Sequence, residues 1–134
     1  MNADTRTAVL ERLRRIPISS TLEFEVLSIG DGVCSLRVPR RTKYDGIHES
    51  FHGGILMTAA DSAAAFAILT LAGADAKIAT TDMGIRFHAK CLTDIRVEAR
   101  VIKLGRTLVP VAVEILDKSD VLVATAQVTY IRLG

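Results

Sequence analysis

The sequence predicts an α+β domain in which an antiparallel sheet of about six strands surrounds one long central helix, preceded by a short N-terminal helix. Six strand-like runs are joined mostly by short turn signals, which favours antiparallel neighbours over the long crossovers that parallel strands need. One Ala-rich stretch without proline interrupts these runs and indicates the long helix. The 134 residues, 49% of them apolar, suffice for one core, so we expect a single domain over residues 1–134.

A short amphipathic helix is expected first, at residues 5–15. Apolar side chains recur there at helical spacing while arginines occupy the other faces, and the pattern ends at Pro17. The apolar positions are Val9, Leu10, Leu13 and Ile16.

A β-hairpin is expected next. Two strand-like runs, 22–29 and 33–38, flank the turn sequence Gly-Asp-Gly at 30–32. Apolar and polar residues alternate in the second run, which places Cys34 on the core side. Residues 39–51 are polar, contain turn formers and show no sustained period, so we expect a loop that leads to the long helix.

The long helix is expected at residues 53–72, with Gly73 placed where a helix C-terminus favours glycine. Four β-rich runs separated by turn-sized segments follow it, at residues 77–89, 94–104, 107–117 and 121–133. Large apolar side chains surround the whole circumference of the helix, and a sheet can cover only one side. The pattern therefore predicts a partner on the other side, most simply a second copy of the chain.

Asp61 is the only ionisable side chain on this helix. Burying a carboxylate among apolar residues costs several kcal/mol unless it is hydrogen-bonded, paired or neutralised. Either a catalytic base or nucleophile, or a structural Asp bonded to Thr58, Ser62 or a partner's backbone, would explain its presence.

The tripeptide His52-Gly53-Gly54 stands where the loop becomes the helix. Glycines allow a ligand to approach the backbone, and the free amides of a helix N-terminus suit a polarised oxygen, as in an oxyanion hole. Ordinary helix initiation explains the same residues. His52 and Asp61 lie ~13 Å apart along one helix, so they can act on one carbonyl only if they come from different subunits, with the site at a dimer interface.

Composition excludes several other classes. The formal net charge is only +2, with no basic block for nucleic acid, and no apolar run of membrane-spanning length stands out. Two cysteines without a CxxC pair suggest neither a disulfide framework nor a zinc site. We therefore expect a cytoplasmic protein that needs no metal or redox cofactor and binds neither nucleic acid nor membrane.

The spacing of His52-Gly53-Gly54 and Asp61, with Gly105-Arg106-Thr107 and the run from Leu122 to Ala126, resembles the hotdog-fold acyl-coenzyme A (acyl-CoA) thioesterases of the phenylacetate-pathway type. The resemblance covers most of the chain. It implies a hotdog dimer, usually paired into a tetramer, that hydrolyses an acyl or aryl-acyl CoA thioester.

By this resemblance Asp61 activates water or attacks the thioester, the Gly53 amide of the neighbouring subunit polarises the carbonyl, and His52 assists. Thr80 would place a hydroxyl near the attacking water. Residues expected to bind substrate are Gly54, Thr81, Arg40, Lys90 and Arg106, the three basic ones through phosphates of CoA. An ordinary strand threonine explains Thr80 and Thr81 more simply, and a solvated rim explains the three basic residues equally well.

Two positions depart from the family pattern. Six residues before the His, where the family commonly has Asn or Gln as a donor to the substrate carbonyl, stands Gly46; where it often has Gly stands Glu49. The missing donor leaves open a non-catalytic acyl-CoA-binding or regulatory module. A hotdog hydratase would need a His on the central helix, and none lies there. A nucleophilic pair of His88 and Cys91 has no orienting acid nearby in the sequence.

Overall fold

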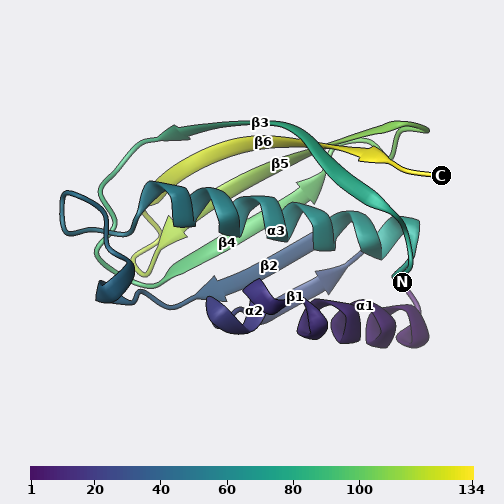
Figure 1. The fold of residues 1–134 in the computed structure, drawn as a ribbon, viewed down its shortest axis with the longest axis horizontal. Coiled ribbons are helices and arrows are strands. Elements are labelled where there is room, and N and C mark those ends of the chain that lie inside the picture. The colour runs from purple at the N-terminus through teal and green to yellow at the C-terminus, as the bar shows by residue number, and fades with distance from the viewer.

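The protein, described over residues 1–134 by a computed structural model, is one six-stranded antiparallel sheet curved around a long helix (Figure 1). The strand order is β1-β2-β4-β5-β6-β3. The elements in chain order are α1 (Ala3–Arg15), α2 (Pro17–Thr21), β1 (Glu25–Gly30), β2 (Val33–Val38), a 3-10 turn (Thr42–Tyr44), α3 (Gly53–Ala72), β3 (Ile78–Phe87), β4 (Ile95–Val101), β5 (Leu108–Asp117) and β6 (Leu122–Arg132). This is the predicted α+β hotdog architecture.

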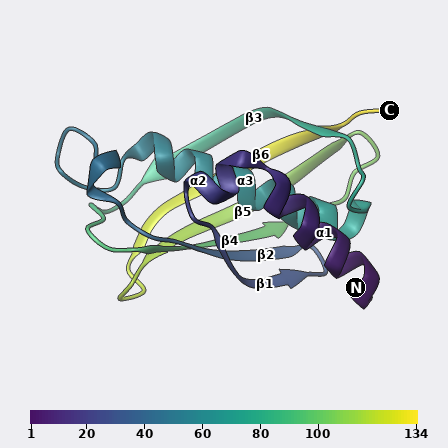
Figure 2. The same cartoon turned by 60° about the horizontal axis from the view of Figure 1, so that its bottom comes forward.

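The N-terminal region contains one more helix than the sequence predicts. The Asn2 side chain accepts a hydrogen bond from the Thr5 amide, so α1 begins at Ala3 rather than at residue 5. Pro17 ends the first pattern but also opens α2, because proline fits the first turn of a helix. Figure 2 shows α1 and α2 in front of α3, and α1 packs against α3.

The first hairpin confirms the predicted turn and shifts one strand. Asp31 and Gly32 both have positive φ (51° and 80°), as a two-residue turn of the mirror-image type requires. The first strand begins at Glu25, three residues later than predicted, because Leu22 caps α2 through backbone bonds. Cys34 is fully buried on the core side.

The predicted bounds of α3 are confirmed at both ends, and Gly73 follows it with φ 102°. Its Ala-rich face is buried against the sheet, whereas Thr58, Asp61, Ser62 and Ala65 form a half-buried stripe at helical spacing on another face. By length and composition alone α3 is apolar enough to span a membrane. Its packing inside the curved sheet accounts for that composition as a core helix.

Strand β3 is an edge strand with a bulge. It pairs only with β6, and the register shifts between Thr80 and Asp82. Ile78 packs against the core before the bulge and Met83 and Ile85 after it, so the inward-facing positions change from even to odd numbers at this point. Because of this change, Thr80 lies on the same side of the sheet as α3.

Cys34 links burial to the pH dependence of stability. Burial, with a smaller contribution from Glu98, raises the pKa of the thiol to about 12, while an unfolded thiol titrates near 9. Between these values the unfolded chain binds fewer protons, so the free energy of unfolding falls as pH rises, by about 2 kcal/mol at pH ~10.5. Urea unfolding at about pH 8 and pH 10.5 should show a smaller fall for Cys34→Ala than for wild type. Equal falls would show that other groups cause it.

Candidate active site

Two hydroxyl groups hold one oxygen of the Asp61 carboxylate. The Thr80 hydroxyl donates to Asp61 Oδ1 at 2.7 Å. The Tyr130 hydroxyl lies 2.9 Å from the same Oδ1 and 2.9 Å from the Asp61 carbonyl oxygen. The other carboxylate oxygen, Oδ2, makes no hydrogen bond within the chain. The side chain is thus fixed through one oxygen and leaves the other available.

The two hydroxyls converge because of the sheet register. Thr80 of β3 and Tyr130 of β6 are directly opposed partners, and side chains of such a pair lie close together on one face. Tyr130 is only 6% exposed. Burial, assisted by the charge of Asp61, raises the pKa of the Tyr130 phenol well above its ordinary value, so the hydroxyl keeps its proton for donation.

Asp61 opens into a groove of about 320 Å³. One wall is the outward stripe of α3, another is the start of β3 with Tyr130, and the third is α1. Seven of its eleven lining residues are hydrophobic, so the carboxylate faces an apolar space. Such a setting strengthens electrostatic interactions with a bound group.

The His52-Gly53-Gly54 tripeptide forms the N-terminus of α3. His52 is the N-cap, and its Nδ1 accepts a hydrogen bond from the Gly54 amide at 2.9 Å. The Gly53 amide makes no hydrogen bond within the chain. A β-carbon on Gly53 would lie 3.2 Å from the Phe87 ring, which packs over this turn. The one free amide is therefore that of Gly53, as an oxyanion donor requires.

Within one chain this donor is remote from Asp61. Eight residues of helix separate Gly53 from Asp61, a rise of ~12 Å. Two groups this far apart on one straight helix cannot contact the same carbonyl group, so a reaction centre that uses both requires two chains.

The loop before α3 contains both positions that depart from the family pattern. Residues 46 to 49 form a turn in which the Glu49 amide donates to the Gly46 carbonyl, and Glu49 has φ 54°. That conformation favours glycine, which accounts for the glycine common there in the family. A β-carbon on Gly46 would lie 3.6 Å from His52 Cα, so a side chain at position 46 would lie beside His52.

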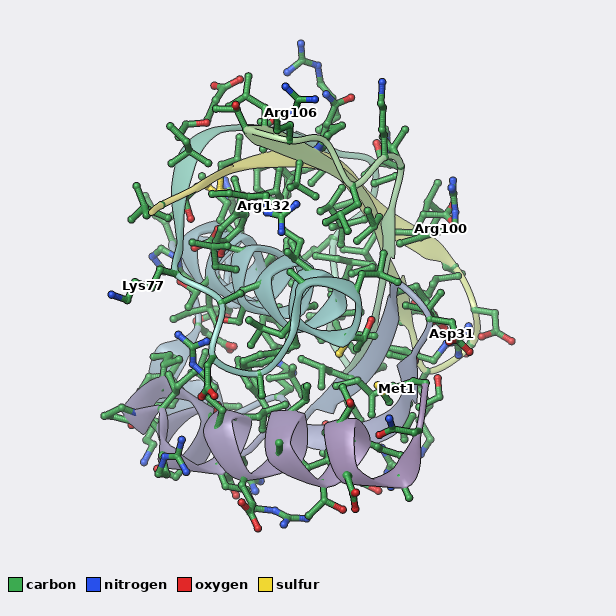
Figure 3. All side chains as sticks on the ribbon, turned by 90° about the vertical axis from the view of Figure 1, so that its right-hand side faces the viewer. Met1, Asp31, Lys77, Arg100, Arg106 and Arg132 are labelled. Carbon is green, nitrogen blue, oxygen red and sulfur yellow. The ribbon has the colours of Figure 1, made fainter.

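The basic residues predicted to bind phosphates are not gathered. Arg40 lies near the N-terminus of α3, where its guanidinium bonds to Asp45 and to the carbonyls of Leu92 and Glu49. Lys90 lies in the exposed β3–β4 connection. Arg106 projects from the opposite end of the molecule, the end that also carries Lys77, Arg100 and Arg132 (Figure 3).

Other predicted or alternative groups have structural partners. The Thr81 hydroxyl, at the bulge, donates to the Thr129 carbonyl at 3.1 Å. His88 pairs with Thr125, and the Cys91 thiol donates to the Thr93 carbonyl, so they do not form a nucleophilic pair. Burial raises the pKa of Cys91, which disfavours the thiolate. No three His, Cys, Asp or Glu side chains lie close enough together to hold a metal ion.

Sequence reasoning missed Tyr130. A tyrosine near the end of a strand is an ordinary β residue, and its link to Asp61, 69 residues away, depends on the register of β3 with β6. The doublet Thr80-Thr81 beside a change in hydrophobic parity was the available signal for the bulge that sets this register.

Comparison with known proteins connects this geometry to a family. Residues 48–131, more than half of the chain, match the family model described as the thioesterase superfamily. A search of curated proteins finds no match. A conserved protein of Pseudomonas aeruginosa is 27% identical with a TM-score of 0.85, over 92% of this chain and 98% of the other.

Two more distant structures share the fold. A thioesterase family protein of Silicibacter pomeroyi is 24% identical with a TM-score of 0.89, over 96% of this chain and 98% of its own. The PaaI protein from the phenylacetic acid degradation operon of E. coli is 18% identical with a TM-score of 0.86, over 97% and 96%. The family match and the shared fold together identify the chain as a member of the thioesterase superfamily, of the hotdog type.

Proposed function

We propose that this protein is an acyl-CoA thioesterase that hydrolyses an acyl or aryl-acyl CoA thioester to the free acid and CoA. The observation that carries the proposal is the Asp61 carboxylate beside a mostly hydrophobic groove, held through Oδ1 by two hydroxyls while Oδ2 makes no hydrogen bond within the chain. A carboxylate kept only for structure would have no need of an unbonded oxygen at the wall of such a groove.

Asp61 acts in one of two ways. As general base, Oδ2 takes a proton from water, the hydroxide attacks the thioester carbon, and the tetrahedral intermediate expels the CoA thiolate, which then takes up a proton. As nucleophile, Oδ2 attacks the carbon itself, CoA leaves, and water hydrolyses the resulting anhydride. Both routes need a positioned carboxylate, and the Thr80 and Tyr130 hydroxyls hold it through Oδ1.

The complete site would lie between two chains. The half-buried stripe of α3, the unpaired edge of β3 and the free Gly53 amide all support a homodimer in which the α3 helices meet antiparallel. In that arrangement the Gly53 amide of one chain polarises the carbonyl that Asp61 of the other attacks, with His52 beside it. Pairing of dimers into tetramers, as the resemblance implies, is a further step of the same proposal.

A non-catalytic acyl-CoA-binding module is the second candidate. Gly46 favours it, because the side-chain donor common in the family is absent.

Our proposal includes a cytoplasmic location, which the two free, buried cysteines support, since a reducing compartment keeps thiols free.

Asp61→Asn tests the catalytic role with little change of shape. The Asn carbonyl can still accept from Thr80 and Tyr130, so the variant should fold and assemble, but it lacks the base. We expect release of CoA from a panel of aryl-, short-, medium- and long-chain thioesters to fall at least about a hundredfold in kcat. Wild type that binds these thioesters without releasing thiol would establish the binding module instead, and a fully active variant would remove Asp61 from the mechanism.

Gly53→Pro removes the donor of the proposed oxyanion hole and adds ring carbons beside Phe87. Proline suits the first helical position, and His52, with φ −62° and ψ 129°, has the extended backbone that must precede it. We expect kcat to fall about a hundred- to a thousandfold. Gly53→Ala adds the β-carbon against Phe87 but keeps the amide, so it should retain most activity.

Mixed dimers test whether the site is shared. A purified heterodimer of one Asp61→Asn chain and one Gly53→Pro chain has one intact site if each site takes Asp61 from one chain and Gly53 from the other. It should recover about half the wild-type rate per dimer although both parents are inactive. Heterodimers as inactive as their parents would refute the shared site.

Tyr130→Phe tests the hydroxyl that fixes Asp61. Loss of the hydroxyl that holds the carboxylate should lower kcat several-fold with KM little changed, because the reacting oxygen is less well positioned. Tyr44→Phe, at the only other tyrosine, whose hydroxyl makes no hydrogen bond within the chain, is the matched control. A loss of activity no larger than the accompanying loss of folded protein would reduce Tyr130 to a packing role.

A further inference from the structure

The groove beside Asp61 extends along α3. Its α3 wall runs from Asp61 through Ala65 and Phe66 to Leu69, which is eight residues of helix, or ~12 Å. Ile78 at the start of β3 and Ile16, which follows α1, also line this groove. The groove is therefore a path with a carboxylate at one end and apolar walls along its length.

Arg12 stands at the other end. Its Nη1 donates to the carbonyls of Ala74 (2.5 Å) and Ala76 (2.7 Å), in the segment that follows α3. Since Ala74 lies five residues beyond Leu69, these bonds hold the guanidinium near the end of the groove that is remote from Asp61.

The guanidinium of Arg12 is only partly used. An arginine carries five N–H donors, and the two on Nη1 have these carbonyls as acceptors, while Nε and Nη2 have no partner within the chain. Arg12 makes no ion pair within the chain, unlike the half-buried Arg40. A partly buried cation with three unsatisfied donors beside an apolar groove is suited to an acceptor that a ligand brings.

Building on the proposed thioesterase, we infer that the acyl group carries a hydrogen-bond acceptor at its far end, a carboxylate or a hydroxyl, which Arg12 binds. The thioester carbonyl lies at Asp61, the apolar body of the acyl group lies along Phe66 and Leu69, and its polar end meets Nε and Nη2 of Arg12. An extended chain advances roughly 1.2 Å per bond, so ~12 Å corresponds to a group of about ten bonds. Arg12 is in this sense a specificity-determining residue.

Matched thioesters test the inference. Octanoyl-CoA, its ω-hydroxy analogue and its ω-carboxy analogue share a chain length and differ only at the far end. We expect wild type to prefer the ω-carboxy or the ω-hydroxy thioester in kcat/KM, and the better of the two identifies the acceptor. Arg12→Met, which keeps the apolar stem, should lower kcat/KM for that thioester about ten- to a hundredfold while changing octanoyl-CoA less than about threefold.

Controls separate specificity from stability and from CoA binding. Arg14→Met removes a positive charge from an exposed face of α1 and should leave kcat/KM unchanged for both the preferred thioester and octanoyl-CoA. Arg12→Lys keeps the charge without the planar fork and should lie between wild type and Arg12→Met. If Arg12→Met does not fold, the wild-type preference and Arg12→Lys still decide the question.

Three results would overturn the inference. In the first, wild type shows no preference for a polar far end. In the second, Arg12→Met lowers kcat equally for all three thioesters, which would mean that Arg12 only stabilises the α3–β3 connection. In the third, Arg12→Met raises KM equally for all three, which would mean that Arg12 contacts CoA. If wild type hydrolyses none of the three or of the wider panel, the proposed function fails. Calorimetric binding of the same thioesters to wild type and Arg12→Met then decides the role of Arg12 separately.

Discussion

The placement of one carboxylate on an apolar helix is the constraint on which the rest of this structure depends. Asp61 is the only ionisable residue of α3, and an unsatisfied carboxylate there would cost several kcal/mol. Two hydroxyls from neighbouring strands meet its Oδ1, and they can do so only if Thr80 and Tyr130 are paired across β3 and β6. The bulge next to Thr80 and the curvature of the sheet around α3 are therefore requirements of the site as well as of the fold.

Local signals predicted the elements but not the contacts that complete the site. The bounds of α3 follow from helix formers between two glycine signals, and the first hairpin follows from Gly-Asp-Gly. The second short helix was missed because proline both stops and starts helices. Tyr130 was missed because its role depends on the pairing of strands far apart in the chain, which period and propensity do not encode.

The same packing that fixes Asp61 leaves part of its helix uncovered. The stripe containing Thr58, Ser62 and Ala65 is half-buried, and the free edge of β3 lies next to it. A strand edge with unpaired backbone groups beside a half-buried helix face is open to a partner, and a second chain would cover both features. In the proposed dimer, stability and catalysis are coupled, because dissociation separates Gly53 from Asp61 as it exposes the stripe.

The glycine at position 46 bears on the choice between enzyme and binding module. A side chain there would lie beside His52 and could donate to the substrate carbonyl, and its absence removes one donor. The Gly53 amide differs from such a side chain because the helix, not a rotamer, sets its position, so in the proposed reaction it would be preorganised for the developing oxyanion. A module that only bound thioesters would need neither this fixed donor nor a carboxylate with a free oxygen. The presence of both the free Gly53 amide and the Asp61 carboxylate favours the proposed thioesterase over the binding module. In that proposal the backbone amide polarises the thioester carbonyl, and Asp61 activates water or attacks the carbonyl carbon.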